Sequence, residues 1–394
     1  MKALTIDSQS NGNIDDLVQR HPNVTHFFLH PGKYHLTRQL EIDRDNIVFA
    51  GLGEAGDVHI IQDTPDANGI VIKGSYVALN HVSIYCEHGS GIALTHSNVS
   101  YVQVEHCQIF GSETYFAVFI AGRSHAVGSA TIAGFEAGEL DSHNTFDNNI
   151  VYCKWSGDAV SFSMQKHGSV RNNIVRGGKL AVYMTQDCVV ANNRVFDSTS
   201  HGIICSMPSR RLRVQNNMLY RSHASAIAVR PQAEHGDYTP ADNAEIVVEG
   251  NVVLSCEYIG IEVENVRGIS IVNNRLRNIK NIGIYLLRAR DCLARHNRLI
   301  SFARGVMIDV ESARCTVRDN WLYSMYPNEA QHAVLVEISA SDSHIDGNAL
   351  YGRFTSNAIE NLATEASPPT SIGINVEDDH IKYAEEMLLW AEMF

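Results

Sequence analysis

The chain contains no run of eighteen apolar residues, so its sequence offers no candidate membrane span. The first residues, MKALTIDSQSNGNIDD, also lack the apolar core of a signal peptide. We therefore expect a cytoplasmic or leaderless protein, with a mature secreted or periplasmic form left open. No proline- or serine-rich linker divides the 394 residues, which favours one domain.

Positive charge is scarce as well. There are 31 Lys and Arg residues against 44 Asp and Glu residues, and the formal net charge is -13. This balance argues against nucleic acid as a partner, because phosphate binding needs a basic surface. It leaves an anionic sugar polymer open, since a local basic patch can oppose the net charge.

The sequence also lacks the spacings of common metal sites. Its eight cysteines form no CxxC motif, and its nineteen histidines form no HExxH motif. We expect most cysteines to be small buried hydrophobic residues, with disulfides or a metal site as weaker alternatives. No metal and no other cofactor is predicted.

What the sequence does contain is a repeat marked by asparagine. Pairs such as NN, GN, HN and DN recur at intervals of 20 to 34 residues. The second residues of these pairs are Asn149, Asn173, Asn193, Asn217, Asn251, Asn274, Asn297, Asn320 and Asn348. A period in this range is typical of a solenoid.

Each repeat also carries a strand pattern. A small residue followed by apolar-x-apolar comes soon after each asparagine, as in IGIEV (259–263) and IGIYL (282–286). This period of two predicts short strands with one face buried. One repeat is too short to bury that face alone, so stacked coils must share a continuous core.

The Asn-marked coil resembles the right-handed parallel β-helix superfamily, which includes pectate lyases, over roughly residues 68–350. The resemblance implies a single all-β solenoid of about 12 coils, with the asparagines hydrogen-bonded from coil to coil. We expect an N-terminal cap and first coils over 1–67, the β-helix over 68–376 and a C-terminal amphipathic capping helix over 377–394. NIDDLVQRHP (13–22) predicts a short helix in the N-terminal cap, which would cover the open strand edges.

Strand alternation assigns candidate outward positions to two columns on one face. The first column is predicted to be Phe119, Ser161, Tyr183, Ile204, Ala228, Glu262, Tyr285, Met307 and Leu335. The second is predicted to be Ala121, Ser163, Thr185, Ser206, Arg230, Glu264, Leu287, Asp309 and Glu337. Insertions at 121–144 and 231–243 are expected to wall this face, since loops on a rigid rod often build sites.

Charge and tyrosine in these columns define a candidate site. Candidate catalytic residues are Glu262, Glu264 and Asp309, because paired carboxylates supply an acid and a base. Candidate substrate-binding residues are Tyr183, His201, Arg230, Tyr285 and Arg288, with His235 and Asp237 from the second insertion. In a lyase or epimerase, Arg230 would neutralise a uronate carboxylate while a Tyr or His moves the C5 proton. A plain surface ion pair between Arg230 and Glu264 is the alternative.

Two β-helical enzyme families can be compared with this sequence in more detail. Mannuronan C5-epimerases share the coil pattern and carry a Tyr-Gly-x-Asp-Pro-His motif, whereas no Asp-Pro-His occurs here. Inulin fructotransferases are similar over 259–350 and are expected to use an Asp/Glu pair. That pair aligns with Asn192 and Ile204, neither of which is acidic.

The sequence thus favours an enzyme of the lyase, epimerase or glycoside-cleaving kind that acts on a poly- or oligosaccharide. The alternative is a non-catalytic β-helix that serves as a scaffold, a glycan-binding protein or an assembly protein. Flat β-helix faces pack well against one another, so a homo-oligomer such as a trimer is also left open.

Overall fold

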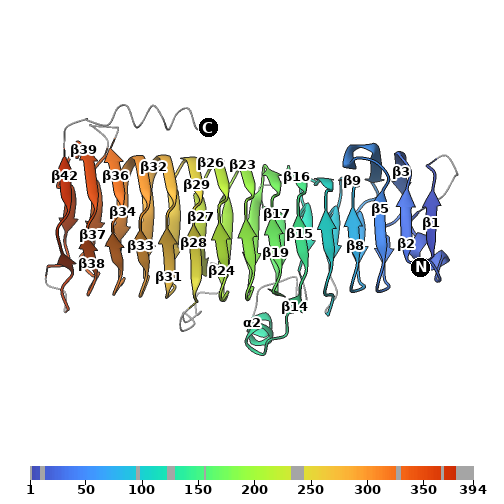
Figure 1. Cartoon of the computed structure of the whole chain (residues 1–394), viewed down its shortest axis with the longest axis horizontal. Coiled ribbons are helices and arrows are strands. Elements are labelled where there is room, and N and C mark those ends of the chain that lie inside the picture. The colour runs from blue at the N-terminus through green and yellow to red at the C-terminus, as the bar shows by residue number, and fades with distance from the viewer. Residues whose placement is uncertain are drawn as a thin grey trace.

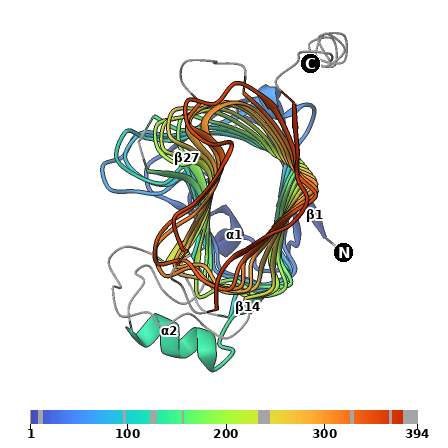
Figure 2. The ribbon, with the colours of Figure 1, turned by 90° about the vertical axis from the view of Figure 1, so that its left-hand side faces the viewer.

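A computed structural model gives the fold of the chain. It describes residues 2–8, 14–94, 98–121, 129–154, 157–231, 244–324, 330–364 and 368–378. The strands stack into one long rod (Figure 1), and the view along the rod shows a closed tube of coils (Figure 2). The predicted all-β parallel β-helix is therefore confirmed. Among the described residues, no helix is long and apolar enough to cross a membrane.

Each coil contributes strands to three faces, which we call A, B and C. Face A is a 15-stranded sheet in which neighbouring strands pair in parallel. Its strands are β1 (Ala3–Ile6), β2 (His26–Leu29), β5 (Val48–Gly51), β8 (Ala78–Asn80), β11 (Gln103–Glu105), β15 (Thr145–Asp147), β19 (Ser169–Arg171), β22 (Val189–Ala191), β25 (Arg213–Gln215), β28 (Ile246–Glu249), β31 (Ile269–Val272), β33 (Leu293–Arg295), β35 (Thr316–Arg318), β38 (His344–Asp346) and β41 (Ser371–Ile372).

Face B follows face A in each coil. Its strands are β3 (Gly32–Leu36), β6 (Val58–Gln62), β9 (Ser83–Cys86), β12 (Gln108–Phe110), β16 (Ile150–Tyr152), β20 (Ile174–Arg176), β23 (Arg194–Ser198), β26 (Met218–Ser222), β29 (Val252–Cys256), β36 (Trp321–Ser324), β39 (Ala349–Gly352) and β42 (Val376–Asp378). Two long strands, β32 (Arg275–Leu287) and β34 (Arg298–Ile308), begin on face B and continue onto face C.

Face C completes the coil. Its other strands are β4 (Leu40–Ile42), β7 (Ile70–Ile72), β10 (Ile92–Leu94), β13 (Val118–Ile120), β17 (Asp158–Ser163), β21 (Lys179–Tyr183), β24 (Ile203–Met207), β27 (Ser225–Pro231), β30 (Ile259–Glu264), β37 (His332–Val336) and β40 (Ile359–Asn361). Outside the three faces lie β14 (Asp141–Ser142), β18 (Gln165–Lys166), α1 (Leu17–Arg20), α2 (Ser129–Glu136) and the 3-10 turn at Ala55–Asp57.

The rod has about 14 turns, so the expected count of about 12 was too low. The asparagine marker begins only at Asn149, and the first coils were counted within a cap. Strand β1 already pairs in parallel with β2, which shows that the coiling begins at the first described strand.

The asparagines form the expected ladder at the turn between faces A and B. The Asn251 side-chain amide, for example, donates to Asn274 Oδ1 at 3.0 Å and to the Val214 carbonyl at 2.9 Å. The same hydrogen bond joins Asn348 to Asn375, which extends the ladder by one asparagine that the repeat pattern had not predicted. A buried amide that satisfies both its donor and acceptor groups ties each coil to the next.

The residue before each ladder asparagine has a different role. Asn273 and Asn216 have φ of 57° and 56°, and glycine occupies the same place at Gly250 with φ of 65°. Left-handed backbone of this kind is tolerated by Gly and Asn more readily than by other residues. The recurring NN pair thus combines one residue that makes the turn with one that bonds the coils.

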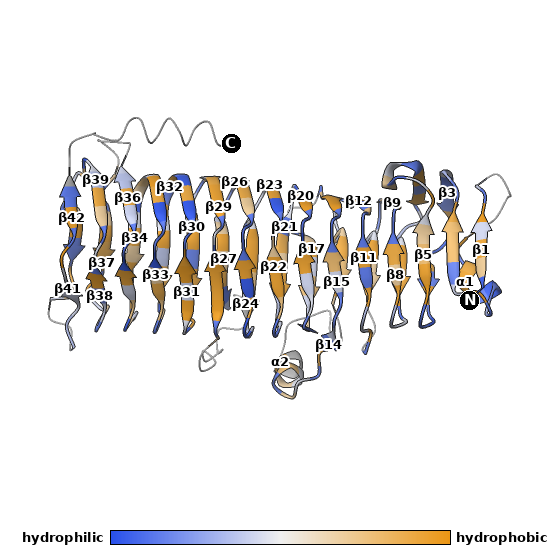
Figure 3. Cartoon of the chain, in the orientation of Figure 1, coloured by the Kyte–Doolittle hydropathy of each residue, from blue (hydrophilic) through white to orange (hydrophobic). Residues whose placement is uncertain are grey.

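The interior of the rod is a continuous apolar core. Inward residues such as Ile261, Val263 and Ile284 are fully buried, and apolar positions run along the strands in Figure 3. All eight cysteines are buried and unpaired, as predicted. Their thiols fill space in the core and form no cross-links.

The two ends differ from each other. Helix α1 is shorter than the predicted 13–22 helix, and it lies across the N-terminal end of the tube with Leu17 and Val18 in the core (Figure 2). At the other end, Glu377 and Asp378 belong to strand β42, so the predicted C-terminal helix does not begin at residue 377. Its remainder, residues 379–394, lies outside the described residues.

Candidate functional site

Most of the predicted site residues that the structure describes lie on or beside the outward side of face C, where strand alternation directs every second side chain away from the core. The observed first column is Phe119, Ser161, Ala181, Ile204, Ala228, Glu262, Tyr285, Met307 and Leu335. It matches the predicted column except in one coil.

That exception is Tyr183, which was assigned to the wrong column. Its backbone pairs with Ser163 on one side and Ser206 on the other, so Tyr183 belongs to the second column and replaces Thr185 there. In GGKLAVYM the inward residues are Leu180 and Val182, two positions earlier than expected. The error arose because Ala181, an outward residue, was read as the small residue that opens the strand.

Glu262 is the centre of the site. Although it points outward, its side chain is only 8% exposed. Its carboxylate accepts a hydrogen bond from the Ser225 hydroxyl one coil earlier, and Arg230 Nη1 lies 3.2 Å from Oε1. Arg230 Nη1 also lies 3.7 Å from Glu264 Oε2, so one guanidinium bridges both predicted carboxylates.

His201 joins this group from just before strand β24, two coils before the strand of Glu262. Its Nε2 lies 3.9 Å from Glu262 Oε2. Burial lowers the pKa of His201 to about 4; the nearby Glu262 carboxylate opposes this shift, and Arg230 and Lys179 add to it. The imidazole is therefore neutral at pH 7 and has a lone pair that can accept a proton.

A second polar group lies beside the first. The Tyr183 hydroxyl donates to Asp158 Oδ1 at 3.1 Å, and Lys179 Nζ lies 3.1 Å from the same oxygen. Burial raises the pKa of the Asp158 carboxyl despite the opposing effect of Lys179. Burial, followed by the Asp158 charge, raises the pKa of Tyr183, so its phenol keeps its proton at neutral pH.

Apolar residues connect the two groups. Ala181, Ile204 and Ala228 form a buried apolar cluster on the outside of face C, and Tyr183 packs against it. Tyr183 also packs against a cluster that contains Phe135 of α2. The described part of the insertion at 121–144 therefore packs beside Tyr183 at one end of the site. Residues 232–243 of the second predicted insertion lie outside the described residues.

The structure does not bring all the predicted residues together. Tyr285 donates a hydrogen bond to Asp309 Oδ2 at 2.5 Å and packs on an apolar cluster of later coils. Arg288 lies in the exposed turn after face C, where its Nε is 3.8 Å from Glu311. Arg288 thus belongs to a surface ion pair, and Asp309 forms a separate pair with Tyr285.

Two predicted residues cannot be placed, because His235 and Asp237 lie outside the described residues. Three contributors were missed, namely Asp158, Lys179 and Ser225. Asp158 precedes the small residue Ala159 in DAVSF, at a position that varies from coil to coil, so the strand pattern gave no signal for it. Within the described residues, no group of three or more His, Cys, Asp or Glu side chains is arranged to hold a metal.

Comparison with known proteins identifies the class. The description "Right handed beta helix region" matches residues 139–239 and 212–365, which together span more than half of the chain. The protein therefore belongs to the right-handed β-helix family. No curated protein sequence matches it significantly.

Solved structures share the architecture at low sequence identity. The A-module of mannuronan C-5 epimerase AlgE6 from Azotobacter vinelandii superposes with a TM-score of 0.66 and 13% identity, over 93% of this chain and 95% of that one. The catalytic domain of a GH87 alpha-1,3-glucanase in complex with tetrasaccharides gives 0.59 and 10%, over 95% and 68%. PfbA, a surface adhesin of Streptococcus pneumoniae, gives 0.50 and 10%, over 82% and 90%. At these identities the similarity shows the fold alone.

Proposed function

We propose that the protein is a carbohydrate-active enzyme that acts on a uronate-containing polysaccharide by moving the proton at C5, as a lyase or an epimerase. The observation that carries this proposal is the pair of polar groups on face C. A neutral imidazole at His201 lies within electrostatic reach of two cations, Arg230 and Lys179, and a protonated phenol at Tyr183 lies beside them.

Each group has a task in such a reaction. Arg230 and Lys179 would neutralise the uronate carboxylate, which makes the neighbouring C–H bond more acidic. His201 would accept the C5 proton, and Tyr183 would donate a proton. In a lyase, the electron pair of the C5–H bond forms the C4–C5 double bond, and the proton from Tyr183 goes to the departing glycosidic oxygen. In an epimerase, a proton returns to C5 from the opposite side.

Glycoside hydrolysis fits the geometry less well. It requires one protonated carboxyl and one ionised carboxylate about 5 to 9.5 Å apart. Glu262 and Glu264 share one cation, Arg230, so the contacts set neither carboxyl group apart as the acid. Asp158, whose pKa is raised, is four strand pairings away from Glu262, or about 19 Å along the rod at 4.8 Å per strand. Neither pair supplies a suitable acid and base.

The comparisons agree with this proposal at the level of class. One similar structure is an epimerase module and another is a glucanase with bound sugars. The missing Asp-Pro-His tripeptide means that the chemistry proposed here would use a different set of residues from the epimerase motif.

A glycan-binding protein without turnover is the second candidate. It is favoured by the ion pairs that Arg230 makes with Glu262 and Glu264, since these contacts already satisfy all three charges. The similar adhesin structure has the same architecture. Such a protein would bind a polymer along the rod and leave it unchanged.

A polymer panel separates the two candidates. Polymannuronate, polygalacturonate, a fructan and a neutral glucan would be incubated with the protein in D2O. Unsaturated uronate would be followed by absorbance, deuterium at C5 by NMR, and reducing ends by colorimetry. The variants are Glu262→Gln, which removes the central charge, and Glu257→Gln, which changes an exposed carboxylate paired with Lys280.

Unsaturated product or C5 deuterium with the wild type and Glu257→Gln, but not with Glu262→Gln at an unchanged melting temperature, would support the proposal. New reducing ends without unsaturation would point to hydrolysis. Binding without any change in the polymer would support the glycan-binding protein.

A further inference from the structure

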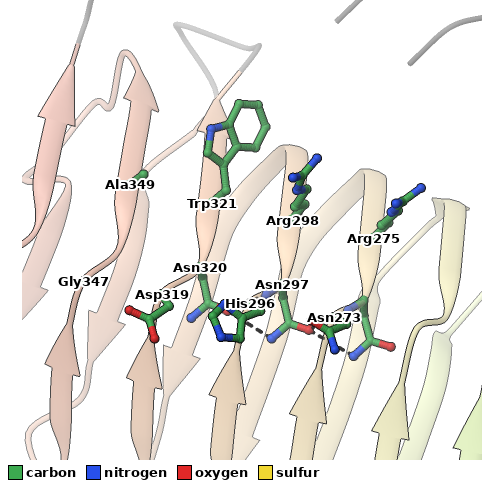
Figure 4. Close-up of a pocket in the computed structure, with 11 residues that line it drawn as sticks. Asn273, Arg275, His296, Asn297, Arg298, Asp319, Asn320, Trp321, Gly347 and Ala349 are labelled. Atoms are coloured by element: carbon green, nitrogen blue, oxygen red, sulfur yellow. Dashed lines mark hydrogen bonds between the residues drawn. The ribbon is translucent and has the colours of Figure 1, made fainter. Parts of the chain in front are cut away.

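A cavity in the later coils lies over the asparagine turn and has a volume of about 630 Å³ (Figure 4). Its arginines, Arg275 and Arg298, both have interaction partners. Its carboxylate, Asp319, forms ion pairs with Arg295 and Arg318 at 3.1 and 3.0 Å. Neither the arginines nor the carboxylate is therefore free to bind a ligand.

A cavity in the early coils differs in this respect. It has a volume of about 560 Å³ and lies at the turn from face B to face C, where strands β6, β9 and β12 end. Small-molecule sites usually have volumes of about 300 to 1,000 Å³ and combine aromatic rings with a few polar groups. The lining of this cavity has that composition, and it shares no side chain with the two polar groups on face C.

One wall of the early cavity is aromatic. Tyr85 pairs with Phe110 and Phe110 pairs with Tyr152, so the three rings form one outward column in successive coils. The ring centroids of Tyr85 and Phe110 are 4.4 Å apart, and those of Phe110 and Tyr152 are 4.9 Å apart. Tyr85 and Phe110 are half-buried and line the cavity. Because the stack already holds these rings in place, a ligand that packs against them has little side-chain entropy to remove.

The turns that line the rest of the cavity are held by two buried polar side chains. Gln62 is 1% exposed, donates to the Asn68 carbonyl at 3.3 Å and accepts from the Thr64 amide at 2.8 Å. The Ser112 hydroxyl oxygen accepts from the Tyr115 amide at 2.8 Å. These hydrogen bonds fix the backbone that carries the acidic residues of the cavity.

The charged side chains of the cavity are free. Asp63, Glu87 and Glu113 are exposed carboxylates that follow strands β6, β9 and β12, and Lys154 adds one ammonium group. In the part of the chain that the structure describes, no ion pair or side-chain hydrogen bond engages any of these four groups. Three negative charges against one positive charge repel an acidic sugar, whereas free carboxylate oxygens accept strong hydrogen bonds from hydroxyl groups.

We propose that this cavity binds an uncharged saccharide. The sugar hydroxyls donate to Asp63, Glu87 and Glu113, and the apolar C–H groups of the sugar pack against Tyr85 and Phe110. The carboxylates do not serve a metal ion, because no group of three such side chains among the described residues is arranged to hold one. The proposal goes beyond the proposed function, since the ligand carries no carboxylate and binding requires no turnover on face C.

Binding is tested by calorimetric titration with uncharged hexasaccharides of glucose, mannose, galactose and xylose. Hexamers of galacturonate and of glucosamine are the acidic and amine-bearing comparisons. The variants are Glu87→Ala, Glu113→Ala and Phe110→Ala, each checked for its melting temperature and titrated well below it. Glu257→Ala is the matched control, because Glu257 follows Cys256 at the end of a face B strand as Glu87 follows Cys86, but lies outside the cavity.

We expect at least one uncharged hexasaccharide to bind and each of the three cavity variants to bind it about tenfold more weakly, since each loses a hydrogen bond or a packing surface. Glu257→Ala should bind as the wild type does. The proposal would be overturned if no uncharged hexasaccharide bound, or if all the variants bound alike. Tighter binding of the galacturonate or the glucosamine hexamer would overturn it too, in favour of an acidic or an amine-bearing ligand. Glu262→Gln should keep this binding, so failure of the proposed turnover on face C is scored separately.

Discussion

Replacement of His201 by glutamine should reduce the loss of folding free energy that the protein undergoes at acidic pH. Burial lowers the pKa of His201 from 6.5 to about 4, whereas in the unfolded chain it titrates near the ordinary value. Between these values the unfolded state binds more protons than the native state, so stability falls as the pH falls. This contribution is present above pH 6.5 and is lost as the pH drops through 4.

The size of this free-energy contribution follows from the pKa shift of His201. Each pKa unit corresponds to about 1.4 kcal/mol, and linkage from pH 7 to pH 4 gives a loss of about 3 kcal/mol from this residue alone. Urea unfolding at pH 7.0, 5.5 and 4.0 would measure the free energy of unfolding of the wild type and His201→Gln. Other histidines and carboxylates titrate in both proteins, so the difference between their pH slopes is the quantity of interest.

The control is His223→Gln, because His223 is exposed on the neighbouring coil. His201→Gln should lose about 3 kcal/mol less than the wild type between pH 7 and pH 4. Equal slopes for the wild type and His201→Gln would refute the reasoning, since they would mean that the native state protonates His201 as easily as the unfolded state does.

Three further changes test other parts of the structure. Asn251→Ala leaves the buried Val214 carbonyl and the Asn217 amide without these partners and should destabilise the fold by about 3–5 kcal/mol. Asn273→Ala affects the left-handed turn and one long, exposed hydrogen bond to Glu249, and should cost about 1–2 kcal/mol. Urea unfolding compares the two, and equal losses would contradict the division of roles within the NN pair. Gly283→Ala would place a Cβ 2.3 Å from Leu299 Cδ2 and 2.6 Å from the Gly305 carbonyl, and a melting temperature equal to that of the wild type would show that the coil can shift to accept it. Tyr183→Phe should lower turnover by about 100-fold, because the donated proton is lost. It also removes the hydrogen bond to the buried Asp158, so kinetics are compared at a temperature well below the melting temperature of both proteins; unchanged kinetics would remove Tyr183 from the proposed mechanism.

The fold was predictable because its marker is local. A ladder asparagine must be asparagine for hydrogen-bonding reasons, so the recurrence can be read without knowledge of the packing. The site was less predictable, because its residues meet only through register. One misplaced strand start moved Tyr183 to the wrong column, and the pairing of Glu262 with Ser225 depends on how a side chain leans toward the preceding coil.

Alternation predicted that Glu262 points outward but gave no information on its burial. Its low exposure depends on Arg230 and on neighbours from other coils, which no pattern within one strand reveals. For the same reason Asp158 and Lys179 were overlooked, since each looks like an ordinary strand end until the stacking places them side by side.

The asparagine ladder also constrains how such a chain can change in length. From Asn251 to Asn320 the rungs recur every 23 residues, and each bonds its neighbour in the same way. Loss or gain of one complete 23-residue period would keep all three faces, both columns and the turn in phase, whereas an indel of any other size would have to be absorbed in a loop between strands. One complete coil is therefore the natural unit of duplication in this protein. A rod of this kind is expected to change in length by whole coils during evolution.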